Sequence, residues 1–508
     1  MTSAIPAGRP SASTSSTQPK QAPPCTMVIF GAAGDLTKRL LMPSLYDLAS
    51  ARRLDAGFQI LGIDLAEQDT AAWRQSLTTT MQSFTKDHTA EFYVPKLDHS
   101  AWQWVSDRLT YQIGDFSKPE TFAAIKKAIG DGSAIFYCAV AARFFGTVVD
   151  GLGQAGLLTQ TDTAFRRVVI EKPFGADLPS AQALNARILQ HADESQFFRI
   201  DHFLGKDSVQ SIMAIRFGNG MIEPTWNRDY IDHVEITAAE TIGVEGRGRF
   251  YEPTGALRDM VPNHMFTLLT MVAMEPPNTY DAQAVRAEKA RLMQAIRPLT
   301  PGDAVRGQYG PGTEFGQPVP GYRQEPQVAP DSRTETYVAL RLHIENWRWA
   351  GVPFYIRTGK RLSGRRTEIS IHYKPAPYRV FGDAPTAPNV LRLLIDPEEG
   401  TDTQFAAKRP GPDMSLGRVV SAMRYKDFFD EKPNVGYETL LYDCMLGDAT
   451  LFQRADAIEA SWAALQPVLD SWARGEGDVE TYGAGSSGPP GADALLAADG
   501  RTWSKLVE

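Results

Sequence analysis

Short apolar runs alternate with amphipathic stretches in the first part of the chain. The first run, Thr26–Phe30, leads through a turn into a helical pattern carried by leucines at positions 40, 41, 45 and 48. Similar strand-like runs, separated by helical stretches, occur at Phe58–Ile63, Ala134–Val140, Val168–Ile170 and Phe197–Ile200. Strands that alternate with helices form parallel sheets with both faces covered. The pattern therefore predicts an α/β domain with a doubly wound parallel sheet over residues 25–200.

The apolar pattern changes to a period of two after residue 205. Every second residue from Val338 to Ile344 is apolar, and the same alternation occurs at Ile369–Ile371 and Val234–Ile236. Such alternation is typical of antiparallel strands with one buried face. Helical stretches lie near 264–275, 283–295 and 439–453. We expect residues 201–508 to form an α+β domain with a large, mainly antiparallel sheet.

Two segments fit neither pattern. Residues 1–24 are rich in Ser, Pro, Thr and Ala and lack the apolar core of a secretory signal, so a disordered N-terminal tail is predicted. Residues 301–331 are rich in Gly and Pro, which predicts a long irregular arm.

Composition and charge exclude several classes of protein. A chain of 508 residues can form two or more large cores, and its net charge of -8 argues against a general nucleic-acid binder. No apolar run approaches the length of a membrane span. Cys25, Cys138 and Cys444 are far apart and form no C-x-x-C, which suits a reducing cytoplasm and gives no disulfide or zinc framework. We therefore expect no metal and no membrane partner.

The turn after the first strand resembles a phosphate-binding loop. Glycines between a strand and a helix let the backbone approach a pyrophosphate at the helix N-terminus. The standard G-x-G-x-x-G is absent, and glycine turns before helices are common, so the motif depends on the strands and helices around it. We expect a Rossmann-like dinucleotide site that includes Gly31, Gly34, Asp35 and Leu36.

Three ionisable groups follow the strand Phe197–Ile200 within six residues. They are Asp201, His202 and Lys206, and each would cost free energy to bury unpaired. Asp201 is suited to orient or charge-balance a second group, and the two cations are suited to bind an anion. The alternative is an ordinary strand exit or a structural ion-pair network.

A second histidine has the surroundings of a general base. His264 closes the segment Arg258-Asp259-Met-Val-Pro-Asn-His, in which Pro262 fits the first turn of a helix. There the positive end of the helix dipole would favour the neutral imidazole. The alternative is a partly buried histidine that caps local structure.

Further charged residues stand at strand ends or in loops. Lys172 follows the strand Val168–Ile170, at the edge where parallel sheets bind ligands. Lys360 ends a strand in R-T-G-K, and Arg365 follows it. Glu240 lies in a glycine-rich segment. Solvated strand ends, surface cations and loop carboxylates are the alternatives.

Together these motifs resemble those of glucose-6-phosphate dehydrogenases. The segment Arg199–Lys206, the E-K-P at Glu171–Pro173, Arg258–His264 and Arg357–Lys360 stand in the family's order, and the resemblance extends from about residue 26 to 474. It implies oxidation of C1 of D-glucose 6-phosphate to 6-phospho-D-glucono-1,5-lactone with NAD(P), the first step of the oxidative pentose phosphate pathway. It also implies a cytoplasmic homodimer or homotetramer, in which residues 201–508 serve substrate binding and oligomerisation.

The resemblance also assigns roles to the charged residues. His264 would be the catalytic base and Asp201 its partner, while Lys172 would contact both sugar and nicotinamide. The remaining substrate-binding residues would be His202, Lys206, Lys360 and Arg365 at the phosphate and Glu240 and Asp259 at the hydroxyls. Three residues depart from the family pattern in ways that should affect substrate affinity rather than reaction type: Phe203 replaces a common Tyr, Ala141-Ala142 replaces Pro-Pro, and Asp396 replaces Gln.

The nucleotide end of the predicted site departs further. NADP-preferring relatives carry a hydroxyl in the glycine turn and an Arg after the second strand, where this chain has Ala33 and Leu65. Asp64 stands just before Leu65, and a carboxylate there suits the ribose 2′-hydroxyl of NAD and repels a 2′-phosphate. We expect a cofactor preference for NAD, or dual use. In the alternative, Asp64 faces solvent and a cation such as Lys38, Arg39 or Arg74 binds the 2′-phosphate.

Two other functions fit part of the sequence. The E-K-P motif also occurs in other sugar oxidoreductases, so a dehydrogenase of another sugar or sugar phosphate is the first alternative. A cofactor-binding paralogue without catalysis is the second, and the intact Asp201, His264 and Lys172 argue against it.

Overall fold

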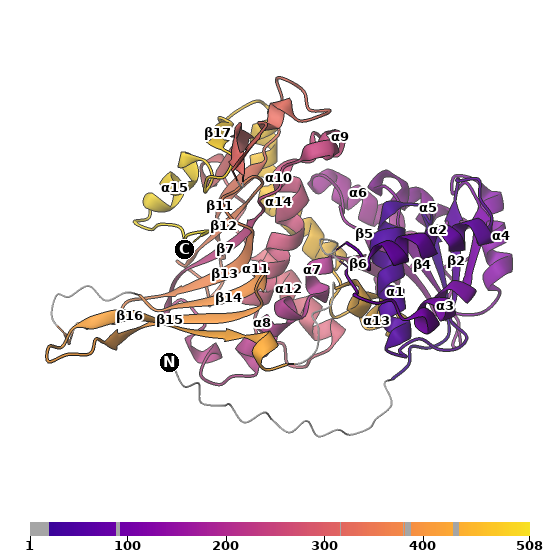
Figure 1. The fold of residues 1–508 in the computed structure, drawn as a ribbon, viewed down its shortest axis with the longest axis horizontal. Coiled ribbons are helices and arrows are strands. Elements are labelled where there is room, and N and C mark those ends of the chain that lie inside the picture. The colour runs from indigo at the N-terminus through magenta and orange to yellow at the C-terminus, as the bar shows by residue number, and fades with distance from the viewer. Residues whose placement is uncertain are drawn as a thin grey trace.

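The computed structural model describes residues 20–87, 92–314, 316–378, 380–381, 388–429 and 436–507. Most of the predicted N-terminal tail lies outside this range. Its last residues are held against the fold, since Ala22 is buried and its N–H donates to the carbonyl of Arg53 at 2.7 Å. Figure 1 shows the N-terminal sheet and its helices on one side of the molecule and the larger sheet on the other.

The N-terminal sheet is six-stranded and entirely parallel, in the order β3-β2-β1-β4-β5-β6. Its strands are β1 (Thr26–Phe30), β2 (Gln59–Asp64), β3 (Leu109–Ile113), β4 (Ala134–Cys138), β5 (Arg166–Glu171) and β6 (Phe197–Ile200). The chain order reverses between β1 and β4, and ligands bind at the carboxyl ends of the strands at such a point. The predicted Rossmann-like sheet is confirmed. The prediction missed β3, a half-exposed edge strand.

Helices cover both faces of this sheet (Figure 1). The α-helices are α1 (Met42–Ser50), α2 (Thr70–Ser83), α3 (His99–Asp107), α4 (Pro119–Ile129), α5 (Phe145–Gln154) and α6 (Leu178–Ile188). A π-helical turn, Thr37–Leu41, precedes α1.

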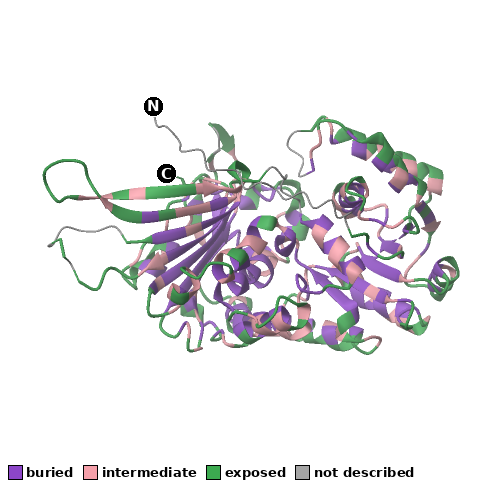
Figure 2. Cartoon of the chain, turned by 90° about the horizontal axis from the view of Figure 1, so that it is seen from below, coloured by how far each residue is buried: buried purple, intermediate pink, exposed green. Residues whose placement is uncertain are grey.

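The second sheet has nine strands, in the order β16-β15-β14-β13-β7-β12-β11-β8-β17. They are β7 (Ile231–Ala239), β8 (Ala304–Gly310), β11 (Tyr337–His343), β12 (Pro353–Gly359), β13 (Arg366–Tyr373), β14 (Val390–Asp396), β15 (Gly400–Lys408), β16 (Leu416–Arg424) and β17 (Glu480–Gly483). Only the β7–β12 and β8–β17 pairs are parallel. The predicted, mainly antiparallel sheet is therefore confirmed. In Figure 2 its central strands are buried, whereas β15 and β16 extend into solvent.

The predicted irregular arm is wrong for much of residues 301–331. Ala304–Gly310 forms β8, which pairs with β11 and β17 inside the large sheet, and Gly312–Glu314 (β9) pairs with Gln317–Val319 (β10). The glycines that suggested a loop fit close packing here. A Cβ on Gly307 would lie 3.1 Å from both Glu480 and Pro489.

Helices pack against one face of the large sheet (Figure 1). They include α8 (Asp207–Phe217), α11 (Phe266–Ala273), α12 (Ala282–Gln294) and α14 (Ala455–Ala473). The helix predicted at 439–453 is α13 (Tyr437–Leu446). It ends earlier because Gly447 takes a left-handed φ of 84° and its N–H bonds back to Asp443.

His264 does not lie in the first turn of a helix, contrary to the sequence-based expectation. Helix α10 (Gly255–Met260) continues through a π-helical turn, Val261–Met265, into α11. Pro262 has no N–H for an α-helical ladder, and the wider π turn accommodates it. The helix dipole therefore does not set the chemistry of His264.

Gly205 has a steric role in the segment after β6. Helix α7 (His202–Gly205) packs beside Gly436, and a Cβ on Gly205 would lie 1.9 Å from the Gly436 carbonyl oxygen. We predict that Gly205→Ala lowers the free energy of unfolding by about 1–3 kcal/mol, the usual range for overpacking. Denaturant unfolding measures this. Gly220→Ala is the control, because its Cβ would meet nothing within 4 Å, and equal midpoints for the two variants would contradict the prediction.

Candidate active site

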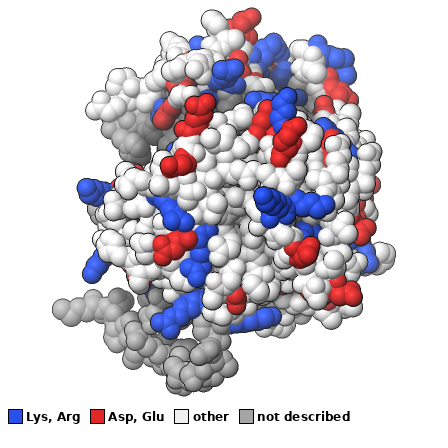
Figure 3. Space-filling model, turned by 90° about the vertical axis from the view of Figure 1, so that its right-hand side faces the viewer, with Lys and Arg blue, Asp and Glu red and all other residues white. Residues whose placement is uncertain are grey.

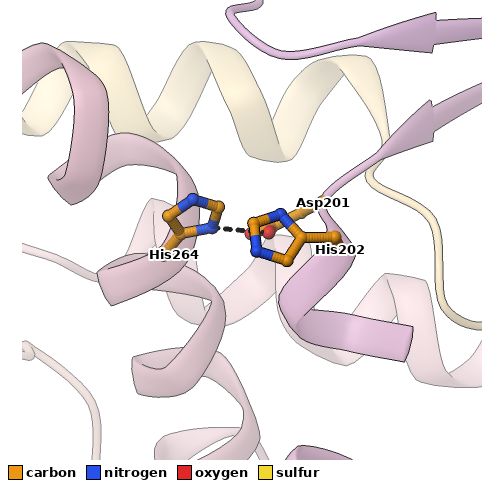
Figure 4. Close-up of side chains that lie close together, drawn as sticks. All are labelled: Asp201, His202 and His264. Atoms are coloured by element: carbon orange, nitrogen blue, oxygen red, sulfur yellow. Dashed lines mark hydrogen bonds and ion pairs between the residues drawn. The ribbon is translucent and has the colours of Figure 1, made fainter. Parts of the chain in front are cut away.

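His264 and Asp201 form a buried histidine–carboxylate pair. The pair lies between strand β6 of the N-terminal sheet and the helices that cover the second sheet. Nδ1 of His264 is 2.6 Å from Oδ1 of Asp201, and both side chains are almost fully buried. Since an ionised carboxylate only accepts hydrogen bonds, Nδ1 carries the proton and Nε2 is left with a lone pair. Figure 4 shows the two side chains facing each other across the space between β6 and the helix of His264, with His202 beside them.

Two further donors hold Asp201. The hydroxyl of Thr267 donates to Oδ2 at 2.6 Å, and the N–H of Phe203 donates to Oδ1 at 3.1 Å. Gln453 in turn donates to the Thr267 hydroxyl at 3.1 Å. Sequence reasoning missed Thr267 and Gln453. The position of Thr267 three residues after His264, one helical turn away, is the only sequence signal that could have indicated it.

The charge of Asp201 is stabilised despite its burial. Desolvation raises its pKa, but His264, His202 and Thr267 together outweigh this and hold the pKa below its usual value. Asp201 is therefore an anion at neutral pH, as a group that orients an imidazole must be.

His202 differs from its sequence-based description as a cation. Burial lowers its pKa well below the usual value, and the adjacent His264 lowers it further, because two protonated imidazoles side by side would repel each other. His202 is thus neutral at pH 7 in this structure, although it can still donate one N–H.

Asn263 fixes the backbone next to His264. Its side-chain amide donates to the carbonyls of Arg258 and Asp259 at 3.3 and 3.2 Å. These are carbonyls that Pro262 and the π turn leave without their usual α-helical partners.

A cleft of about 1640 Å³ opens above the pair. It is lined by eight of the predicted site residues, which come from strands, loops and helices far apart in the sequence: Lys172, His202, Lys206, Glu240, Asp259, His264, Lys360 and Arg365. Asp201 lies beneath them. The cleft also contains charged residues that sequence reasoning did not select, among them Arg247, Arg424 and Lys426.

The charges in the cleft are arranged as ion pairs. Lys172 lies 3.1 Å from Asp259, and Lys360 lies 2.5 Å from Glu240. Burial raises the pKa of Asp259, but Lys172 and His264 more than offset this, so its pKa falls below the usual value. These ion pairs line the cleft, so they can offer hydrogen-bond donors and acceptors to a polar ligand.

Arg365 and Asp396 form a third pair. The guanidinium donates to both carboxylate oxygens, at 2.7 and 2.8 Å. Asp396 is one of the departures from the family pattern, and the structure gives it a contact with the predicted phosphate residue itself.

Glu171, next to Lys172, is a second buried carboxyl. Burial raises its pKa to about 7, although a hydrogen bond from the Tyr137 hydroxyl and the charge of Lys172 act in the opposite direction. Glu171 was not predicted as a site residue, because the burial of an acid at a strand end cannot be recognised from residue type.

The glycine turn has the shape of a nucleotide-binding loop. Gly31 has φ +87°, and a Cβ there would lie 2.2 Å from the carbonyl oxygen of Ala139, which follows β4. The turn therefore lies at the point where the strand order reverses, and only a residue without Cβ fits it. The hydroxyl of Thr37 and the indole of Trp73 donate to the carbonyls of Gly31 and Ala32.

Asp64 faces the glycine turn rather than solvent. Its Oδ2 accepts the N–H of Ala33 at 2.9 Å, and its Oδ1 accepts the N–H groups of Leu65 and Ala66 at 2.8 and 3.3 Å. Arg74, one of the alternative cations, donates instead to the carbonyls of Asp107 and Leu109.

The end of the molecule formed by the N-terminal domain is mixed in charge. Figure 3 shows the end of the molecule formed by the N-terminal domain, where acidic and basic side chains are interspersed. Within the described part of the chain, no helix is both long and apolar enough to cross a membrane.

Known proteins match the chain over nearly its full length. The family profile "Glucose-6-phosphate dehydrogenase, NAD binding domain" matches residues 28–211, and "Glucose-6-phosphate dehydrogenase, C-terminal domain" matches residues 213–504. The glucose-6-phosphate 1-dehydrogenase of Chlamydia pneumoniae is 41% identical over 506 residues, covering 96% of this chain and 97% of that protein. The enzyme of the same name from Aggregatibacter actinomycetemcomitans is 43% identical over 488 residues, covering 95% and 97%.

Two solved structures have the same fold throughout. A glucose-6-phosphate dehydrogenase in complex with its substrate glucose-6-phosphate matches with a TM-score of 0.86 and 30% identity, over 96% of this chain and 100% of that one. Glucose-6-phosphate 1-dehydrogenase from Mycobacterium avium matches with a TM-score of 0.82 and 35% identity, over 96% and 99%. With two family profiles that together span most of the chain and relatives above 40% identity, the chain belongs to the glucose-6-phosphate dehydrogenase family.

Proposed function

We propose that the chain is a glucose-6-phosphate dehydrogenase that oxidises C1 of D-glucose 6-phosphate to the 1,5-lactone, the first step of the oxidative pentose phosphate pathway. The observation that carries the proposal is the buried Asp201–His264 pair at the base of a cleft lined with Lys and Arg. We also propose that the cleft joins a nucleotide-binding domain, residues 25–200, to a substrate-binding domain, residues 201–508.

His264 is the proposed general base. Its Nε2 takes the proton of the C1 hydroxyl while the C1 hydrogen leaves as hydride, so that a C=O bond replaces the C–H and O–H bonds. Asp201 accepts the Nδ1–H, keeps the imidazole in the required tautomer and stabilises the imidazolium that forms. A nicotinamide cofactor, when bound, supplies the hydride acceptor.

The ion pairs of the cleft are suited to orient the sugar. Glu240 and Asp259 carry acceptor oxygens for sugar hydroxyls, and Lys360 and Lys172 hold those carboxylates in place. Lys172 follows the carboxyl end of β5 and belongs to the cleft lining, so it can contact both sugar and nicotinamide. Lys206, Lys360 and Arg365 are the cations of the proposed phosphate site, and His202 contributes an N–H.

Replacing the base should slow the chemical step without weakening substrate binding. We predict that His264→Ala lowers kcat by about 10²–10⁴-fold, the usual contribution of a positioned general base, with little change in KM. Initial rates of NADH or NADPH formation measure both constants. His99→Ala, an exposed histidine on α3, should retain normal rates. Near-normal turnover of His264→Ala would mean that another group is the base.

The phosphate residues can be tested with glucose itself. We predict that His202→Ala and Lys206→Ala each lower kcat/KM for glucose 6-phosphate by about 10–150-fold, which corresponds to about 1.5–3 kcal/mol, because each removes a hydrogen bond to a charged group. Glucose lacks the phosphate, so its kcat/KM should change much less. Lys127→Ala, an exposed lysine on α4, is the control. Equal losses with both sugars would remove these residues from the phosphate site.

The proposed cofactor preference is for NAD, or dual use of NAD and NADP. Gly31, Gly34, Asp35 and Leu36 would hold the pyrophosphate, because they form the turn after β1, at the point where the strand order reverses. Asp64 supports the preference because its carboxylate is held against the glycine turn, where an NADP 2′-phosphate would meet a negative charge.

Exchanging the charge next to the glycine turn should change the preference between NAD and NADP. We predict that the wild type favours NAD by roughly 10–100-fold in kcat/KM, or about 1.4–3 kcal/mol, and that Asp64→Ala/Leu65→Arg moves this ratio toward NADP. Glu67→Ala, an exposed carboxylate in the same loop, should leave the ratio unchanged. A wild type with a strong NADP preference, or an unmoved ratio in the double variant, would contradict the assignment of Asp64.

Assembly as a homodimer or homotetramer and a cytoplasmic location stay predictions. Assays with other sugars and sugar phosphates distinguish the proposed substrate from the alternatives, and a chain inactive on all of them would be a cofactor-binding paralogue.

A further inference from the structure

Two cations of the proposed phosphate site stand at opposite ends of one turn. Lys360 directly follows β12 and Arg365 directly precedes β13, and we call residues 360–365 the phosphate turn. Within it, Arg361 has a left-handed φ of 52°. A residue with a Cβ keeps this conformation only where neighbouring groups hold it there. The positions of the two cations therefore depend on the groups that hold the phosphate turn.

The large sheet and the loop after β7 hold part of the phosphate turn. The N–H of Lys360 donates to the carbonyl of Thr336 at 3.0 Å, just before β11. The N–H of Leu362 donates to the carbonyl of Glu240 at 2.9 Å. These bonds connect the phosphate turn to a residue of the proposed sugar site, but other backbone groups of the turn are bonded by a distant part of the chain.

That distant part is the C-terminal segment, residues 480–507, which includes β17 and helix α15 (Pro490–Ala497). The N–H of Gly485 donates to the carbonyl of Arg361 at 2.8 Å. The carbonyl of Ser486 accepts the N–H of Ser363, also at 2.8 Å. The C-terminal segment thus bonds to the backbone of the phosphate turn at two consecutive positions of its own.

The end of the C-terminal segment also packs against the phosphate turn. A Cβ on Gly364 would lie only 2.9 Å from Cγ2 of Val507. Arg366, directly after the turn, donates to the carbonyl of Lys505 at 3.4 Å. Among the described residues that line the cleft, none belongs to the C-terminal segment. The segment therefore contacts the phosphate turn without lining the cleft itself.

Tyr482 connects the C-terminal segment directly to a cation of the proposed phosphate site. Its hydroxyl donates to the carbonyl of Lys360 at 2.7 Å, and the side chain is only 3% exposed. The hydroxyl of Thr336, 3.0 Å away, can donate to the Tyr482 oxygen and so leaves the phenolic proton for Lys360. Burial raises the pKa of Tyr482 well above its usual value, so the phenol stays a donor at neutral pH.

We propose that Tyr482 is a positioning residue of the substrate phosphate site. By holding the carbonyl of Lys360, it fixes the backbone from which the Lys360 ammonium reaches the cleft, and the rest of the C-terminal segment fixes the course of the turn to Arg365. The inference rests on the proposed function, because it takes both cations as ligands of the substrate phosphate. It adds to that function a determinant of phosphate affinity that is separate from the chemistry at His264.

Steady-state rates of the full-length protein test the role of the phenol. Tyr482→Phe keeps the ring and removes the hydroxyl. We expect its KM for glucose 6-phosphate to rise about 3–10-fold, the range for losing one hydrogen bond, while kcat and the KM of the nicotinamide cofactor change less than about twofold. The competitive inhibition constant of inorganic phosphate should rise by the same factor as KM. Glucose lacks the phosphate, so its kcat/KM should change little.

Tyr337→Phe is the matched control. Tyr337 is buried in the same cluster of aromatic rings, with its ring centroid 5.6 Å from that of Tyr482, and its hydroxyl has no hydrogen-bond partner among the described residues. This variant should keep the wild-type KM. An unchanged KM in Tyr482→Phe, or an equal rise in Tyr337→Phe, would overturn the proposal. Equal losses of kcat/KM on glucose and glucose 6-phosphate would overturn it too, because general damage to the fold affects both sugars alike.

Hydrogen exchange of the wild type, followed by mass spectrometry, needs neither a variant nor turnover. Saturating inorganic phosphate or glucose 6-phosphate should slow amide exchange in residues 360–366 and, through the bonds between the two segments, in residues 482–488. Protection that is confined to the phosphate turn, or absent from both segments, would overturn the proposal. A wild type that oxidises no glucose 6-phosphate would refute the proposed function, and the exchange pattern would still decide this inference.

Discussion

The ionised carboxylate of Asp201 has no contact with solvent, and the arrangement of the candidate site depends on it. A buried charge is costly unless it is hydrogen-bonded on all sides. Its donors come from the start of α7, from the π turn of His264 and from α11. The hydrogen bonds to this one carboxylate therefore join the last strand of the N-terminal sheet to the helices that cover the second sheet. The same bonds leave Nε2 of His264 as the acceptor available to a substrate.

The cleft contains several lysines and arginines that suit an anionic sugar, although the chain is acidic overall. Its cations are held by carboxylates, as in the pairs Lys172–Asp259, Lys360–Glu240 and Arg365–Asp396. In the proposed phosphate site, a bound phosphate would compete with Asp396 for Arg365, and a family member with Gln at that position would lack this competition. Burial keeps His202 neutral, so a phosphate dianion beside it would favour its protonation. Substrate affinity in this chain is thus a balance between these pairs and the phosphate.

Features that depend on neighbouring residues in the chain could be predicted from the sequence. Features that depend on packing between distant segments could not. The strands Thr26–Phe30 and Phe197–Ile200 were predicted at their observed bounds because continuous apolar runs mark buried parallel strands. β8 was missed because its glycines suggest a loop until the neighbouring strand is known. Motif residues such as Lys206 and Arg365 were found to line one cleft, whereas Thr267 was not selected, since a threonine in an apolar helix has no distinguishing pattern. The helix dipole was wrongly assigned to His264 because a π turn cannot be recognised from Pro262 alone.

In the proposed mechanism, Asp201 acts through His264 and has no separate part in the chemistry. The most direct measurement is kcat for Asp201→Asn, His264→Ala and the double variant under saturating substrate. If the two residues form one unit, the double variant is no slower than His264→Ala alone. Losses that multiply in the double variant would show that Asp201 acts independently, and the account of the site would then be wrong.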